Sequence, residues 1–402
     1  MNYLIPIIAL TIAGWLAFSK KLAKSESWQA TVTPLASIMG SGFLISAPLL
    51  GGLVGKWAVF CMAVLLVLAF FVGSAIRFNI RHFEPIEHHK GPSQTVAFVS
   101  RVVLTGAYFI SVTYYLELLS AFSLKQFGVA NPIAADWLTT GLLLLIGVVG
   151  IWKGLSSLEK IEEYAVALNL GMIGALLISL VVHNVGLAVN GNWAMPDVDS
   201  SISGNDVRVL LGLLIVVQGF ETSRYLGAEH EAELRIRTMR RSQIISGVIY
   251  LVFVGLATVL FHKDMGADVT AILGLSKEVA VVLPFLLTIA AVGSQFSASV
   301  ADTAGAGGLI EDITNQKFPE KYAYGLILIV TVAITWSVNV NEVIALASRA
   351  FALFYALQCL VAATVAFRGD KEGKKVPAKG VLFGVLCLIC TGVFLFGLPA
   401  EG

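Results

Sequence analysis

The sequence carries little charge. Asp, Glu, Lys and Arg make up 13% of its 402 residues, whereas hydrophobic residues make up 57% and the mean hydropathy is +0.84. Soluble domains carry charge on about a quarter of their residues. Apolar runs recur along the whole chain, and each is long enough to cross a hydrocarbon core of about 30 Å. The composition predicts an all-α integral membrane protein, because a membrane β-barrel would show short alternating strands instead.

The motifs of common enzymes are also missing. The sequence has no P-loop, no paired-histidine metal motif and no GxSxG nucleophile motif, and its six histidines are scattered. The longest loops have about 20 residues, too few for the output domain of a membrane sensor. The four cysteines all lie in apolar runs, where they are typical of helix packing: Cys61, Cys359, Cys387 and Cys390. We therefore expect no enzyme, no cofactor and no resident metal.

The apolar runs predict about twelve membrane spans. The first run differs from a signal peptide, because its basic residues, Lys20, Lys21 and Lys24, follow it instead of preceding it. It is therefore interpreted as a leading membrane helix. The predicted spans cover residues 2–18, 28–50, 57–78, 93–122, 136–152, 161–184, 207–227, 242–262, 278–303, 322–338, 342–367 and 381–399.

The distribution of basic residues predicts the orientation of these spans. If the loop after the first span is cytoplasmic, 20 of the 27 Lys and Arg residues fall in loops on that side and five on the other. The remaining two, Arg101 and Arg349, lie within spans. This is the positive-inside bias of a correct assignment. It predicts a multi-pass protein of the cell (inner, cytoplasmic) membrane with both termini outside.

Two spans are interrupted by residues that weaken a helix. The span at 28–50 contains GSG at 40–42, and the span at 207–227 contains GFE at 219–221. Gly costs a helix about 1 kcal/mol relative to Ala. After the leading helix, these are the first spans of two successive sets of five, a pattern typical of transporters with inverted repeats. Irregular backbone persists at membrane depth only where it lines a cavity, so the breaks predict a binding site. Close packing of small residues is the alternative.

These stretches resemble a known family. "IMGSGFLISAP" is similar to the first-helix glycine signature of the amino acid–polyamine–organocation (APC) superfamily, which includes the amino acid/auxin permeases. "VVQGFETSRYLGAEHEAELRIRTMRRSQIISGVIYLVFVG" resembles the sixth helix of that superfamily, its short acidic loop and its basic-flanked seventh helix. "GLIEDITNQKFPEKYAY" takes the place of the segment after the eighth helix. The resemblance covers residues 28–400, while the leading helix and the short chain depart from the amino-acid permeases.

The resemblance implies a LeuT-like fold with alternating access. Such a fold has two inverted repeats of five helices, and the first and sixth core helices are broken. By position, the repeats are expected at residues 28–184 and 185–367. A leading helix and loop at 1–27 precede them, and an additional C-terminal helix at 368–402 follows them.

The resemblance also implies a substrate site. In such transporters the first-helix break binds a substrate carboxylate through backbone N–H groups, and the sixth-helix break receives the amine or side chain. Carried over by position, the candidates are Ser37, Gly40, Ser41, Gly42, Phe43, Gln218, Gly219, Phe220, Glu221 and Thr222. Tyr108 in the third core helix is a further candidate, with aromatic packing as its alternative role.

Acidic residues inside spans are candidates for ion coupling. Each would cost at least about 2.5–3.5 kcal/mol at a lipid-facing midplane position, so they are expected to face the interior. Ser299, Asp302 and Thr303 have i, i+3, i+4 spacing on one helical face. In sodium-coupled members of the fold, the eighth helix supplies hydroxyls at that spacing and the first helix supplies carbonyls. The predicted ion-coupling residues are Gly40, Glu117, Ser299, Asp302 and Thr303.

The identity of the coupling ion stays open at this point. Some proton-coupled relatives place a lysine in the fifth core helix, but here that span has none, and Asn169 lies near the expected depth. This favours Na⁺. A desolvated carboxyl is also a plausible proton carrier, so H⁺ remains the alternative. Glu117 has a second interpretation, as a partner that neutralises Arg101 or Arg349.

The sequence as a whole predicts an ion-coupled secondary transporter, a symporter, for a small amino acid or related amine. A proton-coupled carrier or exchanger of another small metabolite is the alternative, followed by a membrane sensor or channel on the same scaffold. The expected partners are the small-molecule substrate, the coupling cation and the lipid bilayer. No nucleic-acid partner is expected, and the chain is a monomer or homodimer.

Overall fold

The computed structural model describes residues 3–40, 42–129, 131–198, 200–227, 229–263, 265, 268–369, 373 and 375–400. Helices dominate these residues, and no strand occurs among them. The helices are α1 (Leu4–Phe18), α2 (Lys20–Ala23), α3 (Glu26–Gly40), α4 (Phe43–Val54), α5 (Ala58–His82), α6 (Pro92–Gln126), α7 (Pro132–Lys153), α8 (Ser156–Val189), α9 (Gly204–Gly212), α10 (Thr222–Tyr225), α11 (Ala232–Ala257), α12 (Ala271–Val279), α13 (Leu283–Ile313), α14 (Glu320–Thr335), α15 (Val340–Arg368) and α16 (Pro377–Phe396). Short 3₁₀ turns cover Gly55–Trp57, Glu84–Ile86, Leu214–Val217 and Thr258–Leu260.

The prediction of an all-helical membrane protein is confirmed. Within the described ranges, nine helical stretches are long and apolar enough to cross a membrane. One of them, 26–82, contains the two predicted spans 28–50 and 57–78. The predicted spans 207–227 and 322–338 are not among the nine, because the first is broken into short pieces and the second forms a helix of only 16 residues. The total of twelve stays a prediction.

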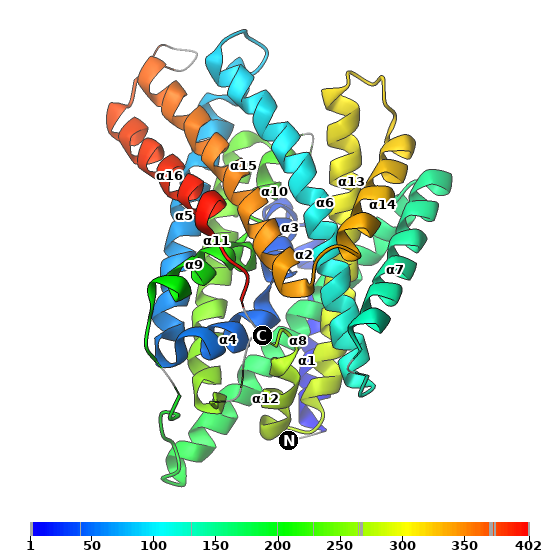
Figure 1. The fold of residues 1–402 in the computed structure, drawn as a ribbon, viewed down its shortest axis with the longest axis vertical. Helices are drawn as coiled ribbons and strands as arrows, with labels where there is room; N and C mark the ends of the chain where they lie inside the picture. The colour runs from blue at the N-terminus through cyan, green and yellow to red at the C-terminus, as the bar shows by residue number, and fades with distance from the viewer. Residues whose placement is uncertain are drawn as a thin grey trace.

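The two broken segments lie at the centre of the bundle (Figure 1). α3 packs against α11 and contacts α10 and α13, while α6 packs along both α13 and α15. Long helices thus surround the two points where the chain leaves regular helical geometry. This arrangement places polar backbone where lipid does not reach it.

The connections between long helices separate into two ends. In Figure 1 the α5–α6 and α13–α14 connections lie at the top, together with the end of α15 and the start of α16. The α6–α7 and α11–α12 connections lie at the lower end. This alternation matches the phase predicted from the basic residues. Which end is cytoplasmic stays a prediction.

The leading helix packs on the rest of the bundle. α1 lies along α8, and a Cβ atom on Gly171 would be only 2.6 Å from the carbonyl oxygen of Ala9. A Cβ on Gly174 would lie 2.9 Å from the Ile12 side chain. The small residues of α8 therefore permit the close approach of α1, and Ala9 is fully buried.

Candidate functional site

The first break separates α3 from α4. α3 ends at Gly40 and α4 begins at Phe43, with Gly42 in an extended conformation (φ 175°) between them. Ser41, a predicted site residue, lies outside the described residues. A Cβ atom on Gly42 would lie 2.8 Å from the Cα atom of Val216, so Gly42 is required by close contact with the second broken segment. A Cβ on Gly40 would meet nothing closer than 4.0 Å.

The second break lies between α9 and α10. After the 3₁₀ turn Leu214–Val217, the chain extends at Gln218 and reaches Gly219, whose φ is +114°. Side chains rarely adopt this conformation. A Cβ on Gly219 would also lie 2.6 Å from the Ser37 Oγ atom and 2.7 Å from the Ile38 nitrogen. The structure therefore brings the two predicted breaks into direct contact.

Side chains take up several backbone groups that the first break frees. The Tyr250 hydroxyl lies 3.0 Å from the carbonyl oxygen of Ile38 and 2.6 Å from that of Val216, so one residue of α11 contacts both broken segments. Gln295 of α13 donates to the Gly40 carbonyl at 3.0 Å. Unpaired backbone groups are costly in a dry interior. Two carbonyl groups of the first break, of the kind expected to bind a coupling cation, are therefore already paired within the protein.

The second break is held in the same way. The Ser348 hydroxyl of α15 accepts a hydrogen bond from the Ile215 N–H at 2.9 Å. The Glu221 carboxylate accepts from the Gly219 N–H at 3.0 Å and from the Tyr355 hydroxyl at 2.7 Å. Glu221 is 1% exposed. Its contacts fix the turn at Gly219.

A cavity of about 100 Å³ lies beside the two breaks. It is enclosed by α3, α6, α8, α10 and α13. We call it the central cavity. Its polar lining residues are Thr33, Ser37, Tyr108, Asn169, Thr222, Ser294, Ser297 and Asp302. Four of the predicted site residues, Ser37, Tyr108, Thr222 and Asp302, thus surround one space, together with Asn169.

Asp302 is the acidic residue of this cavity. The Ser111 hydroxyl of α6 hydrogen-bonds to its carboxylate. Ser299 and Thr303, predicted to share its role, do not line the cavity. Their hydroxyls donate to carbonyl oxygens of their own helix, those of Phe296 and Ser299, at 2.7 Å in each case. The structure therefore separates Asp302 from the two hydroxyls, and an ion-ligand role for those two stays a prediction.

Most predicted residues of the sixth-helix break lie outside the central cavity. Gln218 donates to the Tyr115 hydroxyl at 3.0 Å, and the Phe220 ring stacks on Tyr355 with centroids 5.1 Å apart. Glu221 is engaged as described above. These side chains form a packed polar and aromatic layer between the break and α6 and α15.

Phe43 of the first break is also a packing residue. It is 1% exposed, and its ring lies 4.3 Å from that of Phe253 and 5.4 Å from that of Tyr250, centroid to centroid. The ring thus anchors the start of α4 on α11.

Glu117 does not belong to the central cavity. It lines a separate cavity toward the C-terminal end of α6. The predicted pairing of Glu117 with Arg101 or Arg349 is not found, because Arg101 pairs with Asp312 at 2.6 Å and Arg349 donates to the Phe394 carbonyl.

Sequence reasoning missed Ser294 and Ser297. Both lie on α13, and Ser294, Ala298 and Asp302 follow one another at four-residue intervals along the cavity. The signal was present as i, i+4, i+8 spacing counted back from Asp302. The spacing used in the prediction, which runs forward to Thr303, instead marks a neighbouring face of α13. On that face Gln295 donates a hydrogen bond to the Gly40 carbonyl.

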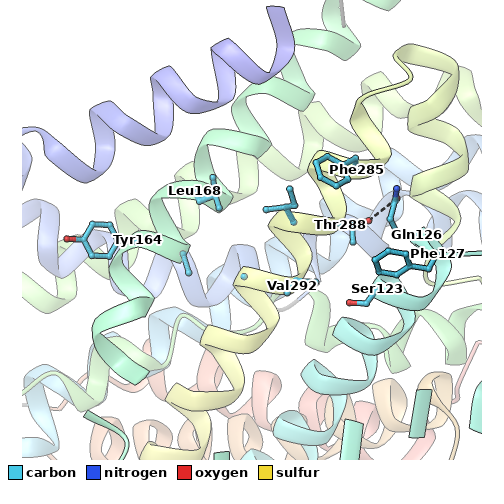
Figure 2. Close-up of a pocket in the computed structure, with 11 residues that line it drawn as sticks. Ser123, Gln126, Phe127, Tyr164, Leu168, Phe285, Thr288 and Val292 are labelled. Atoms are coloured by element: carbon cyan, nitrogen blue, oxygen red, sulfur yellow. Dashed lines mark hydrogen bonds between the residues drawn. The ribbon is translucent and has the colours of Figure 1, made fainter. Parts of the chain in front are cut away.

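Two further cavities lie near the central cavity. A vestibule of about 550 Å³ shares Thr33, Ala36 and Val166 with it and extends between α3, α8 and the loop after α10. The other, shown in Figure 2, is an apolar groove between α6, α8 and α13 that shares no residue with the central cavity. Tyr164 and Phe285 at this groove are more than half exposed, so it opens to the surface of the bundle.

Comparison with known proteins identifies the family. The sequence family described as "APC superfamily transporter" matches residues 20–397. The chain belongs to this superfamily. An uncharacterized protein of Aquifex aeolicus (strain VF5) is 41% identical over 388 residues, covering 94% of this chain and 93% of the relative. The family resemblance seen in the glycine signatures is thereby confirmed.

A solved structure supports the fold. A mutant of a manganese transporter from Eremococcus coleocola aligns with a TM-score of 0.58, over 92% of this chain and 87% of that one. At 14% identity this likeness concerns the fold alone. Among the described residues, no group of three or more His, Cys, Asp or Glu side chains is placed to hold a metal ion.

Proposed function

We propose that this APC superfamily protein is an ion-coupled symporter of a small amino acid or related amine. It works by alternating access in a LeuT-like arrangement of two inverted repeats, residues 28–184 and 185–367, with twelve spans in total. The observation that carries the proposal is the contact between the two helix breaks beside a polar cavity that contains Asp302.

The chemistry of the central cavity suits an amino acid or amine. Asp302 offers a carboxylate to an ammonium group or a cation. The N-terminus of α4, which lies just after the first break and outside the lining of this cavity, offers partial positive charge to a carboxylate. The hydroxyls of Ser37 and Thr222 add neutral hydrogen-bonding groups on the other side.

The size of the cavity bears on the transport cycle. At about 100 Å³, the central cavity has room for only a few water molecules. That space fits an ion or a very small amine, and a larger substrate requires the helices to separate. The vestibule beside Thr33 and Ala36 supplies the route by which one side of the membrane reaches the site.

The same residues support Na⁺ as the coupling ion. Oxygen atoms are the preferred ligands of hard cations. Asp302, Ser294 and Ser297 of α13 and Asn169 of α8 supply oxygen-bearing side chains to the lining of the cavity. Proton coupling is the second candidate, because the carboxylate of Asp302 is hydrogen-bonded to a hydroxyl and can exchange a proton instead.

Thermal stabilisation of the purified protein tests both statements. Amino acids and amines are screened in Na⁺ and in choline buffer, at pH 5.5 and 7.5, on the natural protein and on Asp302→Asn. Asp197→Asn is the matched control, because the same change then falls on a loop side chain that is 90% exposed. We expect one ligand class to stabilise the protein only with Na⁺, and Asp302→Asn alone to abolish this response.

Other outcomes of that screen would change the coupling ion or contradict part of the proposal. Stabilisation that depends on pH and not on Na⁺ selects proton coupling. A response that survives in Asp302→Asn contradicts the role of the central cavity. Failure of every amino acid and amine under all conditions contradicts the substrate class.

A further inference from the structure

A second polar cavity lies at one end of the bundle. The distribution of basic residues predicts that this end is the outer one. It measures about 650 Å³ and is bordered by α6, α7, the loop before α12, and the end of α14 with the start of α15. We call it the outer cavity. It shares no lining residue with the central cavity. Lys125 and Asp268 at its mouth have half-exposed side chains, so it is open to solvent.

The buried acid of this cavity is Glu117. The residue is 5% exposed, and neither carboxylate oxygen has a hydrogen-bond partner within the described part of the chain. On α6, Ser111 points to Asp302 in the central cavity, whereas Glu117 and Ala121 line the outer cavity. A buried carboxylate without a partner is costly. A positively charged group in the outer cavity would remove that cost.

The charged residues around Glu117 do not pair with it, so a positively charged group can do so. Burial acts to raise the pKa of Asp268, but hydrogen bonds from Thr270 and the nearby Lys125 ammonium outweigh it and lower that pKa. Lys125 is thus engaged at 3.3 Å by Asp268. Glu342 accepts a hydrogen bond from the backbone N–H of Asn339 at 2.7 Å. Lys125 is the basic residue in the lining. The lining also contains four acidic residues, Glu117, Asp136, Asp268 and Glu342.

The remaining lining argues against a metal ion. The described residues contain no group of three or more metal-binding side chains. Ala121, Val338 and Trp336 supply apolar and aromatic walls, and the Trp336 indole is fixed by a hydrogen bond of 3.1 Å to the Thr140 hydroxyl. Carboxylates combined with an aromatic face are typical of sites for organic ammonium groups.

We propose that the outer cavity binds an organic ammonium group, which forms an ion pair with Glu117 while its apolar portion lies against Trp336. The proposal does not rest on the function of the central cavity. Two sources share this chemistry: a soluble amine, or the ethanolamine headgroup of a lipid. Trp137 packs edge-on against Trp336 at 5.1 Å and is 64% exposed, as aromatic residues at a membrane interface commonly are.

Binding of butylammonium tests the proposal. Isothermal titration and thermal stabilisation are measured in detergent on the natural protein, on Glu117→Gln and on the control Asp197→Asn, whose side chain is 90% exposed. We expect butylammonium to bind and stabilise the natural protein and Asp197→Asn, and its affinity to fall at least tenfold in Glu117→Gln.

A lipid arm distinguishes the source of the ammonium group. The same three proteins are placed in nanodiscs of phosphatidylethanolamine or of phosphatidylglycerol. Stabilisation by phosphatidylethanolamine that Glu117→Gln abolishes identifies a headgroup site, and a response to butylammonium alone identifies a site for soluble amines. Butylammonium and phosphatidylethanolamine responses that are both unchanged in Glu117→Gln, or both absent, overturn the proposal.

A second variant covers the case in which Glu117→Gln does not fold. Ala121→Phe fills the outer cavity from the same helix and leaves the carboxylate in place. We expect it to abolish the binding of butylammonium and the stabilisation by phosphatidylethanolamine. Retention of whichever response the natural protein shows overturns the proposal.

Discussion

The two helix breaks look alike in sequence but differ in what surrounds them. At the second break, Gly219 is pressed against Ser37, and its N–H is bonded to Glu221, which Tyr355 also holds. At the first break, a Cβ on Gly40 would meet no atom closer than 4.0 Å. The second break is a tightly packed turn, whereas the first break could accept a Cβ atom at Gly40 but not at Gly42. A glycine in a broken membrane helix therefore does not always mark a close contact.

Replacing the glycines should give the largest difference between the two breaks. Gly219→Ala adds a Cβ atom 2.6 Å from Ser37 Oγ at a φ of +114°. Strain and overpacking together are expected to destabilise the protein by about 2–5 kcal/mol. Gly40→Ala is the matched control and should melt within a few degrees of the natural protein. Equal melting temperatures for the two variants would remove the distinction between the breaks.

Glu221 offers the next largest effect. Glu221→Ala leaves the Gly219 N–H and the Tyr355 hydroxyl unpaired in a buried site, which should cost about 2–5 kcal/mol. Tyr355→Phe removes a single hydroxyl and should cost about 1–2 kcal/mol. Thermal unfolding of both variants and of the double variant measures the coupling. Additive effects would show that the two residues act independently, contrary to the structure.

Gly42, the glycine of the first break that contacts the second break, should show an intermediate effect on stability. A Cβ atom on Gly42 would lie 2.8 Å from the backbone of Val216, but its extended φ is open to any residue. Gly42→Ala is therefore expected to cost about 1–3 kcal/mol by overpacking alone. Its melting temperature should fall between those of Gly40→Ala and Gly219→Ala. If Gly42→Ala melts at a lower temperature than Gly219→Ala, backbone strain at Gly219 is unimportant.

The sequence was sufficient to locate the breaks and the acid between them. Gly40, Gly42 and Gly219 stand out because they form short clusters with polar residues that weaken a predicted span, and Asp302 stands out because a carboxylate is unusual at membrane depth. That signal needs no knowledge of packing. The structure places all four within the core of the bundle, and the superfamily match agrees with the resemblance.

The remaining parts of the site depend on contacts between distant residues. Glu221 looks like a ligand for substrate until Tyr355, 134 residues away, is seen to occupy its carboxylate. The rotation of α13 about its own axis is likewise set by packing against α3 and α6, and it turns Ser297 to the cavity and Ser299 away from it. Local spacing cannot determine such a rotation.

Chemical labelling of two neighbouring serines tests the central cavity most directly. In a background with the four native cysteines replaced, Ser297→Cys and Ser299→Cys are treated with a water-soluble thiol reagent. The structure predicts labelling of Ser297→Cys through the vestibule, with protection by the ligand that stabilises the protein, and no labelling of Ser299→Cys. Labelling of Ser299→Cys with an inert Ser297→Cys would contradict the proposed site.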